Sequence, residues 1–483
     1  MIGFLFHPTP STARRTTAGQ SDESRSDRRA ARHPRAHELL LLTIVLLGAV
    51  LRLPGLSTDF WLDEIWSYDV AQQVRSIPDV LLSEPARIDN NHPLNTLLVR
   101  AIGPVKPFWL YRLPSFLAGV GSIFLAARIM RRAGRAPSLA AALLFAVGFP
   151  FVFYSTEARG YAPAVFFALL AFESLLSDLE RPRIAWRATF VISCILGVLS
   201  HLTFVQFYLA AMAWSVLAIR RRERSLVKQL VWWTSLHAIP LAMFATLHQI
   251  FIRHLTIGGA PHQDTLDVLT STLAMLVNGP EARGHSIVAL ALAAIVAIAL
   301  CISLTRLARQ RNDLWLFYVL VIVLSPAFLL TYDLILSARP QPLMVRYFLV
   351  SMAFAALALS HLAHQRLIPL ALILLAAGAW QACTITRGGY SKALARIGPS
   401  TVAADSTFRV GSIIRFYNQY LPAEWQPRFV GEGPAAAASA DWYITTRDSD
   451  RAPESFTIVA SYPAQGLSGT TWRLHQQTPA RGN

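Results

Sequence analysis

Two adjacent carboxylates, Asp63 and Glu64, stand in an aromatic-rich run at residues 60–68 that includes Trp61 and Trp66. The run follows the first long apolar stretch of the chain, and tryptophan favours the interface between membrane and water. A carboxylate held at such an interface can act as a general base that removes a proton from a substrate. The alternative is a solvated loop charge or an acidic residue that stabilises a helix N-terminus. We take Asp63 and Glu64 as the candidate catalytic residues.

Further polar residues stand at the ends of long apolar stretches, among them Glu157 and Arg159. Charges near membrane depth are costly unless they serve a function, whereas a surface pair would contribute little to stability. Arg346 stands where basic residues are otherwise rare, which suits it to bind a phosphate; its alternative is to reach toward lipid headgroups. His201 lies in a short break between two apolar stretches, where it could contact the substrate or have a hydrogen-bonded structural role. The residues expected to bind substrate are His92, Arg112, Glu157, Arg159, Tyr161, His201, Arg346 and Tyr347.

The apolar residues around these motifs are gathered into blocks of membrane-spanning length. Hydrophobic types make up 54% of the chain and charged types 15%, whereas soluble proteins carry about 25% charged residues. Blocks of this kind predict an α-helical polytopic membrane protein with about eleven transmembrane helices. They cover approximately residues 39–53, 109–130, 138–155, 160–176, 188–200, 203–219, 229–251, 286–308, 313–333, 345–363 and 366–384.

Basic residues predict which helix ends face the cytoplasm. When the helices are threaded alternately, every strongly basic segment falls on one side, as the positive-inside rule requires. The net charge of +16 therefore needs no nucleic-acid partner, and none is expected. The N-terminus is predicted to be cytoplasmic, and the candidate site residues gather on the opposite face. The basic segments are residues 131–135, 181–187, 220–228, 306–312 and 364–366.

Composition divides the chain into three parts. Residues 1–37 are rich in Arg, Ser and Thr and predict a disordered cytoplasmic tail. Residues 38–384 form the predicted transmembrane domain, in which residues 54–108 are a first outer loop that carries the candidate catalytic motif. Residues 385–483 mix β-forming and helical patterns, with a hairpin turn at 465–469, and predict a small extracytoplasmic α/β domain. The three cysteines lie in apolar blocks without further ligands, so no metal site is predicted from them.

Taken in chain order, the motifs resemble those of the GT-C superfamily of membrane glycosyltransferases. The branch they resemble most is that of the bacterial relatives of protein O-mannosyltransferases and of the lipid A aminoarabinose transferase (family 39). Leu94, Asn95 and Thr156 replace the proline, tyrosine and glutamine usual in that family, and these departures concern substrate fit more than the charged groups. The matching motifs are residues 51–52 with 60–67, 91–94, 112–115, 154–161 and 346–347.

This resemblance implies a GT-C fold and transfer of a sugar from a polyprenyl-phosphate donor in the bilayer to an extracytoplasmic acceptor, with inversion at the anomeric carbon. The acceptor would be a protein, a lipid or an envelope glycan, and the location the inner (plasma) membrane. Asp63 would act as the base, and Glu64 as its partner or as a cap of the loop helix. Arg346 or a divalent cation would stabilise the leaving phosphate. The paired carboxylates would allow such a cation, and no other cofactor is expected.

Two other classes of function fit some of the same residues. A flippase or transporter of lipid-linked sugars would place charges in the middle of helices along a pathway, whereas the blocks from 286 to 384 carry their charges near their ends. The chain also shows no internal repeat of the kind that many transporters have. A non-catalytic protein that binds lipid phosphates would use the same arginines but would tolerate the loss of Asp63.

Overall fold

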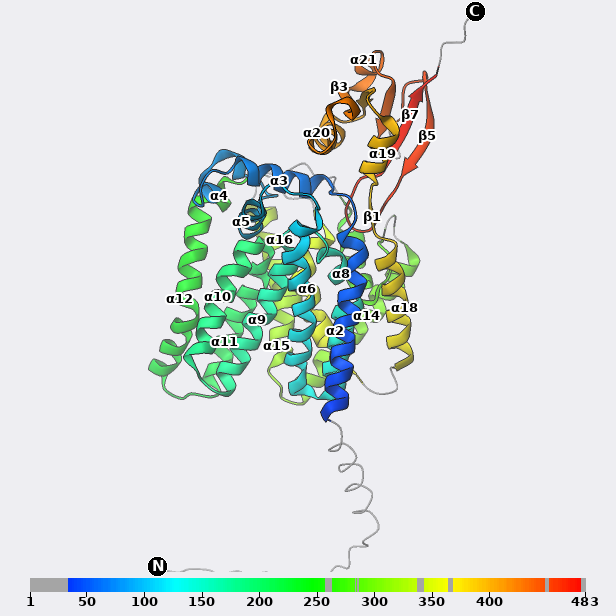
Figure 1. Cartoon of the computed structure of the whole chain (residues 1–483). Coiled ribbons are helices and arrows are strands. Elements are labelled where there is room, and N and C mark those ends of the chain that lie inside the picture. Colours follow the sequence, from blue (N-terminus) through cyan, green and yellow to red (C-terminus); the bar gives the residue numbers. More distant parts are fainter. Residues whose placement is uncertain are drawn as a thin grey trace, which may run out of the picture.

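The computed structural model describes residues 34–256, 263–282, 284, 286–336, 343–363, 368–447 and 451–478. The predicted tail at 1–37 lies outside the described residues except for its last four positions, as does the predicted inner turn at 364–366. Figure 1 shows a bundle of helices that carries a small sheet-containing region at one end. The chain enters the bundle at the opposite end, through α2 (Pro34–Leu56).

The helix bundle confirms the predicted class, an α-helical multi-pass membrane protein. Six helices of the described part are long and apolar enough to cross a membrane, and shorter apolar helices pack among them. The predicted number of about eleven spans is not confirmed by this count. The bundle consists of α2, α6 (Trp109–Met130), α7 (Arg135–Val147), α8 (Phe149–Tyr154), α9 (Tyr161–Glu180), α10 (Ile184–Ser200), α11 (Val205–Arg220), α12 (Leu226–Ile250), α13 (Thr265–Ala274), α14 (Ile287–Arg309), α15 (Leu314–Val319), α16 (Ser325–Leu336), α17 (Leu349–Ser360) and α18 (Ile368–Cys383).

One of the predicted continuous helices is interrupted, and another is locally irregular. The block at 138–155 ends one helix at Val147 and begins another at Phe149, because Gly148 takes an extended conformation and Pro150 follows at the second position of α8. The block at 313–333 stays helical but contains a π-helical segment, Leu320–Leu324, between α15 and α16. Apolar periodicity alone does not reveal such features, because the residues on both sides remain apolar.

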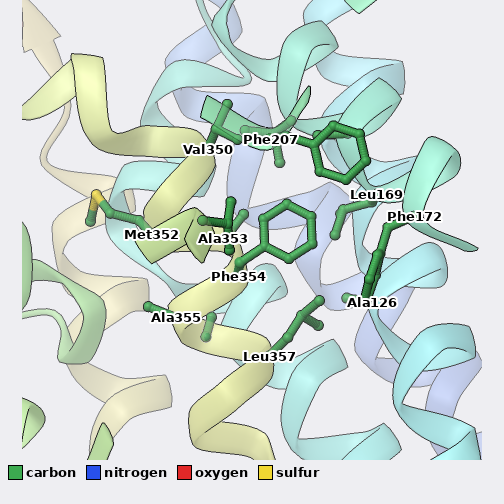
Figure 2. Close-up of a cluster of buried hydrophobic side chains, with 14 of the residues drawn as sticks. Ala126, Leu169, Phe172, Phe207, Val350, Met352, Ala353, Phe354, Ala355 and Leu357 are labelled. Carbon is green, nitrogen blue, oxygen red and sulfur yellow. The ribbon is translucent and has the colours of Figure 1, made fainter. Parts of the chain in front are cut away.

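The helix α17 is packed on all sides by protein, which fixes the end that carries Arg346 and Tyr347. Most of its side chains are buried, including Phe354. Figure 2 shows Phe354 beside Phe207 and Phe172, with ring centroids 5.5 Å and 5.4 Å away. Aromatic pairs at these distances add to the free energy gained from burial alone. The turn Val345–Phe348 directly precedes this helix, so its position is set by the core.

The predicted outer loop at 54–108 is largely helical. It contains α3 (Leu62–Gln73), α4 (Asp79–Leu82) and α5 (Pro93–Ile102), which lie across the end of the bundle that faces the sheet-containing region (Figure 1). Pro93 occupies the first turn of α5, where its missing N–H and fixed φ are favourable. The residue before it, His92, has the extended backbone expected before proline.

The predicted small α/β region is present after α18. Its five-stranded sheet has the order β3-β2-β4-β7-β5, in which β2 is parallel to β3 and β4, and β7 is antiparallel to β4 and β5. The strands are β2 (Thr401–Ala404), β3 (Arg428–Glu432), β4 (Trp442–Thr445), β5 (Phe456–Tyr462) and β7 (Trp472–Gln477), with a separate pair β1 (Thr386–Arg387) and β6 (Ala464–Gln465). Helices α19 (Tyr390–Ile397), α20 (Ser412–Asn418) and α21 (Gly433–Ala437) accompany the sheet.

Candidate active site

A cavity of about 570 Å³ lies where the outer helices, the ends of the bundle helices and the C-terminal region meet. It brings together residues that are up to 386 positions apart in the sequence, from Trp61 to Arg447. Seven of the ten predicted site residues line it, whereas Glu64, Arg112 and Glu157 do not. The seven are Asp63, His92, Arg159, Tyr161, His201, Arg346 and Tyr347.

Asp63 faces two guanidinium groups in this cavity. It stands in the first turn of α3, and its Oδ2 contacts Nη1 of Arg159 and lies 3.4 Å from Nη1 of Arg346. The Asp63 side chain is 17% exposed and that of Arg346 is 16% exposed, while Arg159 is almost fully buried. Arg159 is therefore the fixed partner of Asp63, and the longer contact leaves Arg346 able to bind a ligand from the cavity.

Two histidines pack next to Arg159 and Tyr161 in the same cavity. The rings of His92 and His201 are 4.5 Å apart, and Tyr161 lies 4.2 Å from His201. Nε2 of His92 is 3.2 Å from Nη2 of Arg159, and because an arginine can only donate, His92 accepts there and its proton sits on Nδ1. Burial, together with the positive charge of Arg159, holds the pKa of His92 well below its usual value. His92 is therefore neutral at neutral pH.

The close approach of two bundle segments explains how these residues meet. A Cβ atom added to Gly160 would lie 1.6 Å from the carbonyl oxygen of Ser200 and 3.2 Å from Cβ of His92. Only glycine allows the backbone to pass so close to the end of α10. His201 follows directly, and its Nδ1 accepts from the backbone N–H of Thr203 at 3.1 Å. Its proton is therefore on Nε2, the opposite tautomer from that of His92.

Glu64 turns away from the cavity into a fully buried pair with Arg112. Nε and Nη2 of Arg112 donate to its two oxygens at 2.8 Å and 2.6 Å, and neither side chain has exposed surface. The backbone N–H groups of Ala158 and Trp61 donate to the same carboxylate at 2.8 Å and 3.3 Å. Burial would raise the pKa of Glu64, but the contact with Arg112 outweighs it and the pKa is lowered. The geometry thus favours the cap of the loop helix, the second of the two roles expected for Glu64.

The remaining donors of Arg112 also bind the protein itself. Nη1 donates to the carbonyl of Thr58 at 2.7 Å and Nη2 to that of Asp59 at 2.9 Å. Arg112 therefore ties the chain before α3 to α6 and holds α3 in place. We infer that Arg112 and Glu64 position Asp63 rather than contact a substrate.

Glu157 joins the bundle to the C-terminal region. Its buried carboxylate accepts from Ser468 and lies 3.8 Å from Nε of Arg387. Burial raises the pKa of Glu157, although the charge of Arg387 partly opposes the shift. Arg387 further donates to the carbonyl of Gly55 at 3.0 Å. The predicted turn at 465–469 thus contacts the segment that carries Arg159, a contact that local sequence patterns do not reveal.

Sequence reasoning also missed the residues that the C-terminal region contributes to the cavity. Ser406, Phe408, Arg409 and Arg447 line it, and the ring of Phe408 packs edge-on against Trp66 at 5.3 Å. The signal available in the sequence was an aromatic residue and two arginines a few positions after the stretches that form β2 and β4, which is too common a pattern to mark a site.

The two carboxylates do not form a shared metal site. Asp63 contacts arginines in the cavity, and Glu64 is saturated by Arg112 and backbone N–H groups. In the part of the chain that the structure describes, three or more His, Cys, Asp or Glu side chains nowhere gather in a way that could hold a metal ion. The cation next to Asp63 in this structure is therefore supplied by arginine side chains.

Comparison with known proteins supports the resemblance. Residues 96–248 match the family model of dolichyl-phosphate-mannose-protein mannosyltransferases, a range that includes Arg112, Glu157, Arg159, Tyr161 and His201. No curated protein sequence matches the chain. The match confirms, over this range, the similarity to protein mannosyltransferases of the GT-C superfamily.

Solved structures with a similar arrangement are distant in sequence. The oligosaccharyltransferase of Archaeoglobus fulgidus, in complex with Zn and sulfate, is 13% identical, with a TM-score of 0.45 over 84% of this chain and 68% of that one. ArnT from Cupriavidus metallidurans in its apo state is 11% identical, with a TM-score of 0.40 over 91% of this chain and 98% of that one. The same ArnT bound to undecaprenyl phosphate is 10% identical, with a TM-score of 0.35 over 90% and 97%. These similarities are too low to inform the site.

Proposed function

We propose that this chain is a membrane glycosyltransferase that transfers a sugar from a polyprenyl-phosphate donor to an acceptor outside the cytoplasm. The observation that carries the proposal is the meeting of Asp63, Arg159 and Arg346 in one cavity at an end of the helix bundle. A lipid-linked donor presents its phosphate at the membrane surface, where a partly exposed arginine can receive it. The family match at residues 96–248 supports the same class of reaction.

In the proposed reaction Asp63 is the general base. It removes the proton from the acceptor hydroxyl while the acceptor oxygen forms a bond to the anomeric carbon of the donor. The bond between that carbon and the phosphate oxygen breaks on the opposite side, and polyprenyl phosphate leaves with the electron pair. Attack from the side opposite the leaving group inverts the configuration at the anomeric carbon.

The cations would act on the leaving phosphate. Arg346 would exchange part of its contact with Asp63 for the donor phosphate, whose negative charge grows as the bond breaks. Arg159 would stay with Asp63, since it is buried against His92 and Tyr161. A phosphate leaving group needs no general acid, which agrees with the neutral state of His92.

The C-terminal region would form the acceptor side of the cavity. Phe408 and Arg409 face the same space as Asp63, and Ser468 fixes this region to the bundle through Glu157. Which sugar and which acceptor the cavity receives would be decided in part by this wall. We place the enzyme in the inner membrane, with the N-terminus in the cytoplasm and the cavity on the extracytoplasmic face.

The two other readings lack a comparable observation. A transport pathway would need exposed charges inside the bundle, but the buried Arg52 of α2 has its guanidinium directed to Ser155 and to carbonyl oxygens such as that of Gly48. A protein that only binds lipid phosphates would gain nothing from a carboxylate beside Arg346, because its negative charge repels the phosphate.

Sugar transfer by strains that produce defined variants tests the proposal. We expect Asp63→Asn to lower transfer by about 10²–10⁴-fold, the usual contribution of a general base, while the protein remains folded. Asp69→Asn is the matched control, because Asp69 lies on the same helix α3 but outside the cavity. Mass spectrometry of envelope glycans, glycoproteins and lipids, with and without the protein, would identify the product. Near-normal transfer by the purified Asp63→Asn protein would refute the assignment of Asp63.

A further inference from the structure

A second cavity lies at the end of the bundle opposite the candidate active site. It has a volume of about 290 Å³ and is lined by the ends of α9 and α11, residues 311–313 between α14 and α15, the start of α15, and the turn Arg131–Ala133 that follows α6. In Figure 1 these helix ends point away from the C-terminal region. A ligand bound here would therefore sit at the other membrane surface from the sugar donor.

The polar lining of this cavity is predominantly cationic. Four arginines face two carboxylates, and three of these arginines are held by neighbours. Arg132 donates from Nε to Glu180 at 2.6 Å, Arg221 pairs with Asp313, and Nη1 of Arg222 donates to the carbonyl of Leu179. The carbonyl contact orients Arg222 without neutralising its charge. The charged residues of the lining are Arg132, Glu180, Arg221, Arg222, Arg311 and Asp313.

Arg311 is the least compensated of these cations. Its side chain makes no ion pair or hydrogen bond with the described residues. Its backbone has φ of +55°, a left-handed conformation at a helix end that glycine or asparagine usually occupies. The C-terminal ends of α9, α11 and α14 attract positive charge, but this attraction does not require an arginine at the left-handed position. The arrangement leaves two guanidinium groups without a counter-charge, that of Arg311 and that of Arg222, whose contact with the Leu179 carbonyl leaves other N–H groups to receive an anion.

The rest of the cavity lining is largely apolar. It consists of Leu176 and Leu179 of α9, Trp214 and Ala218 of α11, and Leu314. A small inorganic anion would make no use of these side chains. A ligand with a phosphate at one end and hydrocarbon at the other would match both the cationic and the apolar lining, and lipids of this kind surround the helix ends in a membrane.

We propose that this cavity binds the phosphate headgroup of an anionic lipid. Arg222 and Arg311 donate charge-assisted hydrogen bonds to the phosphate oxygens, and the first part of the lipid chains packs on Leu176, Leu179 and Trp214. Basic loops attract anionic membrane surfaces in general, but that attraction depends only on the number of charges. A built site depends on which arginines carry them.

Lipid binding by two charge-matched double variants distinguishes a specific site from general attraction between basic loops and an anionic membrane surface. The full-length protein is titrated in detergent with phosphatidylglycerol or phosphatidylcholine, and bound lipid is counted by native mass spectrometry. Arg222→Gln with Arg311→Gln removes the two uncompensated cations of the cavity. Arg224→Gln with Arg309→Gln removes the same charge close by, at a residue of the connection that carries Arg222 and at the last residue of α14, and neither residue lines the cavity. Arg311→Gln alone serves as a second test, because Arg311 has no side-chain contact that folding would lose.

We expect the first double variant to bind phosphatidylglycerol about tenfold more weakly, or worse, since two charge-assisted contacts are removed. The control pair and the binding of phosphatidylcholine should be unchanged, and inorganic phosphate should not displace the lipid. An equal loss in both double variants, or equal binding of the two lipids, would overturn the site. Displacement by inorganic phosphate at the lipid's own concentration would overturn its assignment to a lipid. None of these outcomes depends on sugar transfer.

Discussion

Replacing Glu64 with glutamine tests whether this carboxylate holds the site together. The change keeps the shape of the side chain but leaves the guanidinium of Arg112 buried without its counter-charge, although Arg112 keeps its bonds to backbone carbonyls. Both side chains are fully buried, and removing one partner of such a pair costs about 3–5 kcal/mol. That is a large part of a total stability of about 5–15 kcal/mol. The Asp63→Asn variant should lose less free energy of unfolding, because Asp63 is partly exposed to the cavity.

Unfolding of the purified protein by sodium dodecyl sulfate in mixed micelles measures this difference. Glu84→Gln is the matched control, because Glu84 is 84% exposed and its pair with Arg87 lies at the surface, where such pairs contribute about 0–1 kcal/mol. When Glu64→Gln is combined with Arg112→Gln, the loss in free energy of unfolding should be smaller than the sum of the losses in the two single variants. If Glu64→Gln unfolded with the same free energy as the Glu84→Gln protein, the structural role of Glu64 would be wrong.

The remaining predictions concern the donor, the pH dependence and the contact with the C-terminal region. Arg346→Ala should weaken the binding of polyprenyl phosphate about tenfold or more, because a charge-assisted contact is lost; unchanged affinity in a direct binding assay would count against it. The pKa of His92 is lower in the folded protein than its usual value of 6.5, so the unfolded chain binds the extra proton first. The stability that the neutral His92 gives the folded protein is therefore complete above about pH 6.5 and is lost as the pH falls toward the folded pKa. In thermal unfolding between about pH 5 and 7.5, the stability of His92→Gln should change less with pH than that of the unchanged protein. Ser468→Ala removes a partner from the buried Glu157 and should make the C-terminal region more sensitive to limited proteolysis, while an unchanged cleavage rate would exclude this contact as the one that holds it.

The sequence alone predicts which membrane surface the site residues share, but not how they are paired. Asp63 and Arg346 stand at apolar block ends that thread to one side, so their meeting is foreseeable from sidedness. The separation of Asp63 from Glu64 is not, because adjacent residues of a helix project about 100° apart and the direction of each depends on the placement of α3. The cap formed by Glu64 is also hidden, since Trp61 replaces the Ser or Thr that usually marks a capping box.

Long-range packing accounts for the features of the fold that local patterns miss. The contact between Ser468 and Glu157 joins residues 311 positions apart, and a hairpin turn looks the same in sequence whether or not it docks on another domain. The helix break at Gly148 and the π-helical segment Leu320–Leu324 both lie within apolar blocks. Hydropathy measures apolar content and not backbone geometry, so it reveals neither of them.

A structure of the protein with its polyprenyl-phosphate-linked donor bound would test the central claim most directly. The account predicts the donor phosphate within hydrogen-bonding distance of Arg346. It also predicts the anomeric carbon between that phosphate and Asp63, with room for an acceptor oxygen about 3–3.5 Å from the carbon. A donor whose phosphate lies away from Arg346, or whose anomeric carbon no acceptor held by Asp63 could reach, would contradict it.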